Sequence, residues 1–260
     1  MQKVLNVLKD ECSLDESSMF LDVGSGLGKP NIHAAAAVPL KGSVGIEVIP
    51  LRYYLSLVNL RRVISLDIPL DKDQANCPVA FANTDVLNLR SLTPMTHIFL
   101  FDVGMPVKVM KHLAKIFNRS RTAKYLVCFK KPKLVKEFGF DADFMRKISV
   151  SMVSSAESHS CFVYVKDQVN KVDDVLDTGL AEIAHACRFR PVDSYCHYLD
   201  NEIQNWQHGQ KSLRRKSERL VKNQDEHTEK NKNGKRNQSK DDEPSHETCS
   251  KKRKHHDTLK

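Results

Sequence analysis

Residues 19–47 constrain the fold of this chain most, because they contain a strand, a glycine turn, a short helix and a second strand in close succession. The apolar run 19–23 is typical of a buried strand, and three alternating glycines follow it. Glycine allows the positive φ that a tight turn needs, and Pro30 stands where a first helical turn tolerates proline. The pattern predicts a parallel sheet that binds ligands at the carboxyl ends of its strands.

The residues around these glycines favour one of two nucleotide classes. The dinucleotide fingerprint G-x-G-x-x-G fails, because its last position is Lys29. The pattern present is D-x-G-x-G-x-G, and an acid beside the turn suits a ligand with a positive centre and an amino group, as S-adenosylmethionine has. An acid at the end of the second strand is placed to accept hydrogen bonds from a ribose diol. The predicted cofactor-binding residues are Asp22, Gly24, Ser25, Gly26, Gly28 and Glu47.

Apolar runs later in the chain predict five more strands, the last two as a hairpin. They are residues 78–83, 96–101, 124–129, 147–154 and 160–165. Apolar residues at helical spacing predict helices around and after these strands. These helices are residues 1–12, 50–64, 107–117, 134–140, 172–187 and 192–206. We therefore expect an α/β fold, a seven-stranded Rossmann-like sheet of the class I methyltransferase order with flanking helices.

Residues that follow the third and fourth strands are further candidates for the site. Asp85 is placed to accept from an adenine amino group and Val86 to pack on the ring; alternatively, Asp85 only caps the next short helix. Asp102 is the one catalytic candidate: it orients the methionine end of the cofactor, accepts from an incoming amine, or only caps the following helix. Residues 102–106 contain no aromatic side chain to stack on a base, which disfavours methylation of adenine N6.

Several classes of site are not expected. The seven cysteines are scattered and odd in number, which is typical of reduced thiols inside the cell. His185, Cys187, Cys196 and His197 match no common zinc spacing, so we expect no metal site. No apolar run approaches the roughly 20 residues of a membrane span, so we expect no membrane partner.

Charge divides the chain into a nearly neutral part and a basic tail. Residues 211–260 contain 16 Lys or Arg against 9 Asp or Glu, a net charge of +7, whereas residues 1–210 contain 25 against 23, a net charge of +2. The tail has no Phe, Tyr or Trp, so it cannot bury enough apolar surface to offset the entropy of ordering. Residues 211–222 are expected to form a basic helix before disorder begins.

These patterns predict a methyltransferase domain over residues 1–207 and a basic, largely disordered tail over 208–260. The domain has its sheet core at 19–166 and added helices at 172–207. Residues 211–260 are expected to contact nucleic acid, an attachment that weakens with salt. The run Lys251-Lys-Arg-Lys254 predicts nuclear import, without which the protein would be cytoplasmic.

The motif resembles that of the non-SET histone lysine methyltransferases, the disruptor-of-telomeric-silencing (DOT1-like) family. Residues 22–28 (DVGSGLG) and 45–47 (GIE) match its first two motifs position by position, and the resemblance covers about residues 19–102. It implies S-adenosylmethionine as cofactor and a histone or nucleosome as partner. Residues 102–106 depart from the asparagine-phenylalanine run of the family, and only 18 residues precede the sheet, so the substrate channel is not carried over.

Three functions are therefore open at this point. The first is methylation of a protein lysine, that of a histone, on chromatin in the nucleus. The second is methylation of RNA or of a non-histone protein by the same fold, with the basic loop 130–133 near the acceptor. The third is a catalytically inactive nuclear adaptor, in which the glycines only form a tight turn.

Overall fold

The structure is a computed structural model that describes most of the chain. The described residues are 1–66, 77–151, 158–167, 180–184 and 191–237. The chain divides after Trp206 into two units, and the described residues of each are considered by themselves. Within the described residues, no helix combines the length and the apolar character that a membrane span needs.

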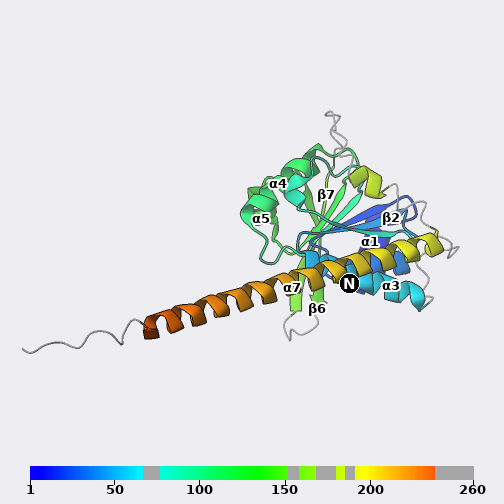
Figure 1. The fold of residues 1–260 in the computed structure, drawn as a ribbon. Coiled ribbons are helices and arrows are strands. Elements are labelled where there is room, and N and C mark those ends of the chain that lie inside the picture. Colours follow the sequence, from blue (N-terminus) through cyan, green and yellow to red (C-terminus); the bar gives the residue numbers. More distant parts are fainter. Residues whose placement is uncertain (67–76, 152–157, 168–179, 185–190, 238–260) are drawn as a thin grey trace, which may run out of the picture. The chain divides into compact units, whose positions relative to one another are not determined.

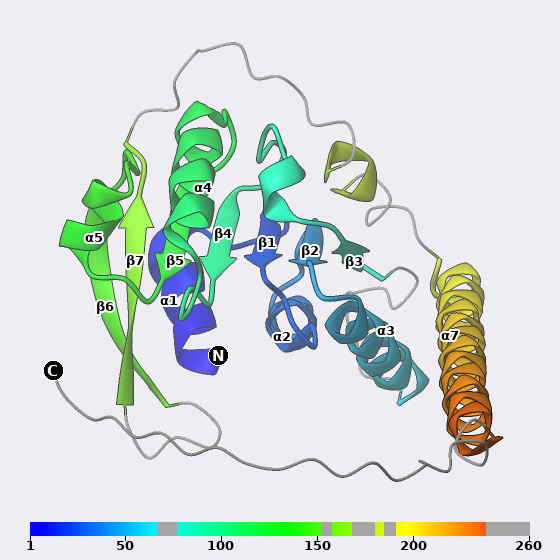
Figure 2. The ribbon, with the colours of Figure 1, turned by 60° about the vertical axis from the view of Figure 1, so that its left-hand side comes forward.

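A seven-stranded sheet of order β3-β2-β1-β4-β5-β7-β6 forms the centre of the first unit (Figures 1 and 2). Its strands are β1 (Met19–Val23), β2 (Gly42–Glu47), β3 (Val79–Asn83), β4 (His97–Leu100), β5 (Tyr125–Cys128), β6 (Asp143–Ser151) and β7 (Ser158–Val165). The first five strands are parallel, whereas β7 is antiparallel to β5 and to β6. The chain moves outward from β1 first to β2 and β3 and then to β4 and β5, so the topological switch point lies between β1 and β4.

Helices cover both faces of this sheet (Figure 2). One face carries α1 (Gln2–Cys12), α2 (Lys29–Ala37) and α3 (Pro50–Ser65); the other carries the short helix η1 (Val86–Asn88), α4 (Val107–Arg119) and α5 (Pro132–Glu137). Successive side chains of each strand point to opposite faces of the sheet, so the core is divided between the two faces. Phe99 and Val127 pack with α1, whereas Ile98 and Leu126 pack with α4.

The structure confirms the predicted fold, and the largest differences in element boundaries are at β6 and α5. Strand β6 begins at Asp143 rather than at residue 147, because residues 143–146 continue the ladder with β7. Helix α5 begins at Pro132, which suits a first helical turn, and ends at Glu137 before Gly139 at φ 91°. Of the predicted helix 172–187, residues 180–184 are described and helical.

Helix α7 (Val192–Asn237) is longer than the sequence predicts. Within the first unit, Trp206 packs on α3, because its indole stacks on Tyr54 with ring centroids 4.0 Å apart. The basic helix expected over 211–222 is part of α7, which continues through residues where disorder is predicted. Residues 192–237 contain no proline, the residue that most strongly interrupts a helix. Residues 238–260, which include the predicted import signal, lie outside the described residues.

Candidate functional site

The turn after β1 is fastened to the end of β2 by backbone hydrogen bonds. Gly24 and Ser25 donate their N–H groups to the carbonyl oxygen of Ile46, at 2.9 and 3.0 Å. The turn therefore lies at the carboxyl edge of the sheet, next to the switch point between β1 and β4. The four predicted turn residues (Gly24, Ser25, Gly26 and Gly28) are brought together there.

Two of the glycines are required by their surroundings. Gly28 has φ 73°, and an added Cβ would lie 2.3 Å from the ring of Phe81, which reaches across from β3. Gly24 has φ 77°, and an added Cβ would lie 3.1 Å from Cε of Met105 in the loop after β4. Phe81 and Met105 therefore occupy the Cβ directions of Gly28 and Gly24. Nothing lies within 4 Å of an added Cβ at Gly26, so a ligand can approach the backbone closely there.

Asp22 is a buried carboxylate with no hydrogen-bond partner for either oxygen among the described residues. It is 1% exposed and lies one residue before the end of β1. Burial in a poorly solvated site, with a smaller contribution from the charge of Glu47, raises the pKa of Asp22 to about 8. The hydroxyl of Ser25 in the adjoining turn likewise has no partner among the described residues. Such groups are rare in folded proteins and indicate a missing ligand or water.

Glu47, in contrast, is fully engaged with the backbone. Its Oε2 accepts from the N–H of Gly26 at 2.9 Å, and its Oε1 accepts from the N–H of Ile49 at 2.8 Å. The side chain is 3% exposed and holds the glycine turn against the end of β2. Each oxygen keeps further acceptor capacity, so ribose binding by Glu47 stays a prediction.

A cavity of about 570 Å³ lies over Asp22 and the turn. It is lined by Asp22, Gly24, Ser25, Gly26, Leu27, Lys29, Pro30, Arg52, Leu55, Phe99 and Phe101. An acid at its base and two cations, Lys29 and Arg52, in its wall match a ligand that carries an ammonium and a carboxylate on one carbon. The volume lies within the range of small-molecule and cofactor sites.

Asp85 and Val86 are engaged within the fold and do not line this cavity. The carboxylate of Asp85 accepts from the N–H of Leu87 at 2.9 Å and caps η1, which is the alternative that the sequence left open. Val86 is 8% exposed and packs in the core beneath α4. Their contact with adenine stays a prediction.

Asp102 joins the ends of two strands. Its Oδ1 accepts from the N–H of Phe129 after β5 at 2.9 Å, while its Oδ2 has no partner among the described residues. Burial raises the pKa of this carboxyl. Asp102 is fully buried and does not line the cavity, and its predicted catalytic role stays a prediction.

Sequence reasoning missed the aromatic side chain at the mouth of the cavity. Phe101 is 42% exposed, and its ring meets that of Phe129 edge-on with centroids 5.1 Å apart. Phe101 is the last residue of the predicted fourth strand, and its apolar side chain there is typical of a core residue. The available signal was its position: it directly precedes Asp102 at the carboxyl end of a strand beside the glycine turn.

The described residues contain no group of three or more His, Cys, Asp or Glu side chains arranged to hold a metal. Of the four residues considered for zinc, Cys196 and His197 lie in α7, whereas His185 and Cys187 lie outside the described residues.

The sheet order, the antiparallel hairpin and the glycine turn at the switch point together define a class I methyltransferase fold. Within that class, the family model described as "Histone methylation protein DOT1" matches residues 1–57. This match confirms the resemblance predicted from the two motifs, over a shorter stretch than residues 19–102. No curated protein matches the sequence.

Solved structures with a similar fold include three methyltransferases at low identity. An RNA methyltransferase from Salinibacter ruber in complex with S-adenosyl-L-homocysteine is 18% identical, covering 66% of this chain and 95% of that one, with a TM-score of 0.40. TrmK from M. capricolum, also with S-adenosyl-homocysteine, is 11% identical, covering 78% and 83%, with a TM-score of 0.45. The N-methyltransferase NodS from Bradyrhizobium japonicum is 12% identical, covering 64% and 96%, with a TM-score of 0.47.

Proposed function

We propose that this protein is an S-adenosylmethionine-dependent methyltransferase. The observation that carries the proposal is the buried carboxylate of Asp22, unpartnered among the described residues, beneath a glycine turn at the switch point of the sheet. Leaving a buried polar group unpaired costs about 1–3 kcal/mol, and more for a charged one. A cationic ligand removes that cost on binding.

The residues of the cavity supply complementary partners for such a ligand. Asp22 would accept from the ammonium, and Lys29 or Arg52 would pair with the carboxylate of the methionine part. Gly26, which has no atom within 4 Å of an added Cβ, gives the ligand bare backbone to approach. When bound, S-adenosylmethionine supplies an electrophilic methyl group on its sulfonium. The task of the protein is to align the acceptor with that group and to exclude water.

For the acceptor we propose a protein lysine, that of a histone. Two observations support it: the histone-methylation family model matches residues 1–57, and the mouth of the cavity is aromatic at Phe101. A lysine must lose a proton before it can attack, and a desolvated aromatic surface lowers its pKa. Chromatin as the site of action, and nuclear import through residues 251–254, belong to the same proposal.

RNA as acceptor is the second candidate, and one observation favours it. Residues 101–150 contain 12 Lys or Arg against 4 Asp or Glu, and they begin at the mouth of the cavity. A non-histone protein as acceptor has no such separate support.

Cofactor binding is tested by calorimetry with S-adenosylmethionine on the full chain. We expect saturable heat for the wild type and at least a tenfold weaker affinity for Asp22→Asn. The matched control is Asp10→Asn, an exposed acid of α1, which should bind like the wild type. Absence of binding by the wild-type protein would overturn the methyltransferase proposal and leave the adaptor.

The acceptor is tested with methyl-labelled cofactor and three substrates: nucleosomes, free histones and total RNA. Label on a histone lysine supports the proposal, and Phe101→Ala should then lower kcat/KM for the histone by a larger factor than it weakens cofactor binding. Label on RNA alone would overturn the histone version and support the second candidate.

A further inference from the structure

The near neutrality of residues 1–210 hides a strong separation of charge. Residues 101–150 contain 12 Lys or Arg against 4 Asp or Glu, a net charge of +8, whereas residues 1–100 contain 9 against 10 and residues 151–210 contain 4 against 9. The basic surface is therefore not confined to the tail. Charge concentrated in one part of a fold is the electrostatic footprint of a polyanionic partner.

Helix α4 carries the centre of this basic segment. Its cations Lys108, Lys111, Lys115 and Arg119 recur at intervals of three and four residues, so they share one face over about 16 Å. The helix contains no Asp or Glu, and its other face packs into the core. An ordinary solvated helix face mixes both signs of charge, because alternating pairs stabilise it. We call the four side chains the α4 ridge.

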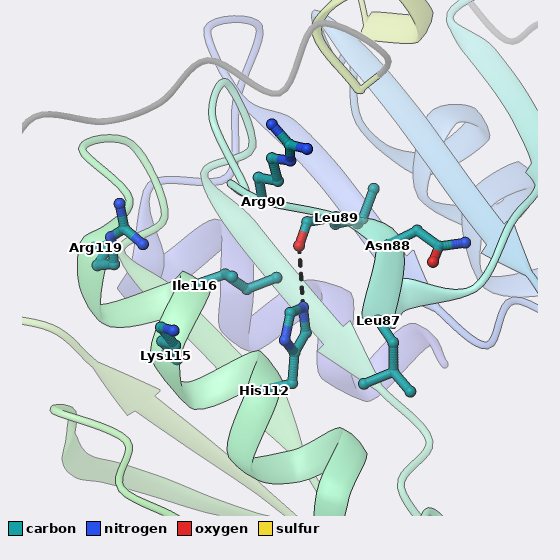
Figure 3. Close-up of a pocket in the computed structure, with 8 residues that line it drawn as sticks. All are labelled: Leu87, Asn88, Leu89, Arg90, His112, Lys115, Ile116 and Arg119. Atoms are coloured by element: carbon teal, nitrogen blue, oxygen red, sulfur yellow. Dashed lines mark hydrogen bonds between the residues drawn. The ribbon is translucent and has the colours of Figure 1, made fainter.

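A cavity of about 350 Å³ opens beside the ridge, between α4 and residues 87–90 (Figure 3). Its floor is apolar, with Leu89 and Ile116, and His112 lies across it with Nε2 3.0 Å from the carbonyl oxygen of Leu89. Figure 3 shows Arg90 and Arg119, from the two separate elements, at the same end of the pocket. Among the described residues, those that line it include three cations, Arg90, Lys115 and Arg119, and no carboxylate.

The ridge leads away from the candidate cofactor cleft. Helix α4 begins at Val107, just after the loop whose Met105 lies against Gly24 of the glycine turn. Successive turns of the helix then carry cations from that loop to the pocket. A linear polymer bound along the α4 ridge would have one end at the cofactor cleft and one of its monomers at the pocket.

We propose that the α4 ridge and its pocket bind nucleic acid, with backbone phosphates on the cations and one nucleotide in the pocket. Lysine and arginine neutralise phosphates, and a planar guanidinium also stacks on bases. The apolar floor and the imidazole of His112 suit the flat face of a base or a ribose, which an acidic peptide does not offer. This site is separate from the tail, and the inference stands whether or not the proposed cofactor binds.

The test uses the full-length double variant Lys115→Glu/Arg119→Glu and a control of equal charge. The control is Lys3→Glu/Lys9→Glu, which reverses two exposed lysines on α1 across the sheet. Anisotropy would follow binding to labelled single-stranded RNA and duplex DNA of about 20 nucleotides and to polyglutamate, over about 50 to 200 mM salt. Thermal unfolding and cofactor calorimetry on the same variants show whether folding and the cleft are intact.

We expect the ridge variant to bind nucleic acid at least tenfold more weakly. Two lost phosphate contacts should reduce the slope of log Kd against log salt by about 1.4 on single-stranded RNA and about 1.8 on duplex DNA. The control should change affinity about twofold or less, because exposed charges at a distance are screened. The RNA and DNA arms identify the kind of nucleic acid. Equal loss in both variants, no loss in either, or a larger loss on polyglutamate than on either nucleic acid would overturn the proposal.

Discussion

The two edges of the central sheet differ in how completely their buried polar side chains are hydrogen-bonded. At the amino edge, Lys166 donates from Nζ to the carbonyl oxygens of Phe117 and Ser120, at 2.9 and 2.6 Å, and His97 Nε2 lies 2.9 Å from the carbonyl oxygen of Cys12. At the carboxyl edge, among the described residues, buried side-chain oxygens stand without partners. They are Asp22 Oδ1 and Oδ2, Ser25 Oγ and Asp102 Oδ2.

This difference distinguishes polar groups that stabilise the fold from polar groups that are available to a ligand. A buried polar group that is satisfied from within contributes to stability, whereas one left unpaired lowers it. Among the described residues, one further buried side-chain oxygen without a partner is Asn31 Oδ1, which belongs to α2. Changes at the amino edge should therefore destabilise the protein, and changes of charge at the carboxyl edge should affect binding.

Lys166→Met should have the largest effect. The substitution keeps an unbranched apolar chain but removes the charged donor, in a site that is 1% exposed. The carbonyl oxygen of Ser120 loses the Lys166 donor, and that of Phe117 keeps only the N–H of Ser120 at 3.2 Å. We expect the free energy of unfolding to fall by about 2–4 kcal/mol. Denaturant unfolding measures it, with exposed Lys124→Met on the neighbouring strand end as control. A loss below about 1 kcal/mol would contradict the contrast between the edges.

Gly28→Ala should follow, with a stability loss of about 2 kcal/mol or more. The residue combines φ 73° with a Cβ position 2.3 Å from the ring of Phe81, so both backbone strain and overpacking contribute. Gly26→Ala is the matched control, because Gly26 has φ 55° and no atom within 4 Å of an added Cβ. Thermal unfolding should place Gly26→Ala clearly closer to the wild type. Equal losses would show that the Phe81 contact is irrelevant.

These two glycines also show what the sequence can and cannot predict. The alternation of glycines after a strand predicts the turn, its place at the carboxyl edge and the neighbouring Asp22. It does not predict that Phe81, more than 50 residues later, covers Gly28, because that contact depends on how β3 packs beside β2. Local pattern determines the path of the turn, and tertiary packing determines which glycine is indispensable.

The same limit applies to charged residues. The sequence predicts Glu47 at the end of the second strand. It does not predict that both of its oxygens accept backbone N–H groups, because those bonds depend on how the chain folds around Gly26 and Ile49. Lys166 looks like any surface lysine in the sequence, and only the end of α4 next to β7 makes it a buried donor. The basic ridge was missed for a different reason: a net charge averaged over 210 residues conceals it.

Asp22→Asn should separate binding from stability. Asparagine keeps the volume of the side chain and removes the buried charge, so we expect the free energy of unfolding near pH 8 to stay equal or to rise. Affinity for S-adenosylmethionine should fall at least tenfold, which corresponds to about 1.4 kcal/mol. Asp102→Asn is the comparison, because an amide oxygen can still accept from Phe129 N–H. A destabilised Asp22→Asn with unchanged affinity would mean that Asp22 is structural.

The final prediction is a pH dependence of stability, to which one titrating group at each edge contributes with opposite sign. Burial lowers the pKa of His97 to about 4, so the unfolded chain binds the extra proton and this histidine makes stability rise with pH between about 4 and 6.5. Asp22 has its pKa raised from 3.8 to about 8, so the folded state binds the extra proton there. Its contribution is fully present below pH 3.8 and is lost as the pH rises to about 8.

Between pH 6.5 and 8, His97 is neutral in both states and of this pair only Asp22 acts. Stability should therefore fall with pH in this window, with a limiting slope of about 1.4 kcal/mol per pH unit for one proton. Melting temperatures of wild type and Asp22→Asn, measured side by side without ligand, isolate the effect, because the variant lacks this titration. Parallel curves for the two proteins would show that the carboxylate titrates alike in the folded and unfolded chain, and the contrast between the two edges would then lose its electrostatic basis.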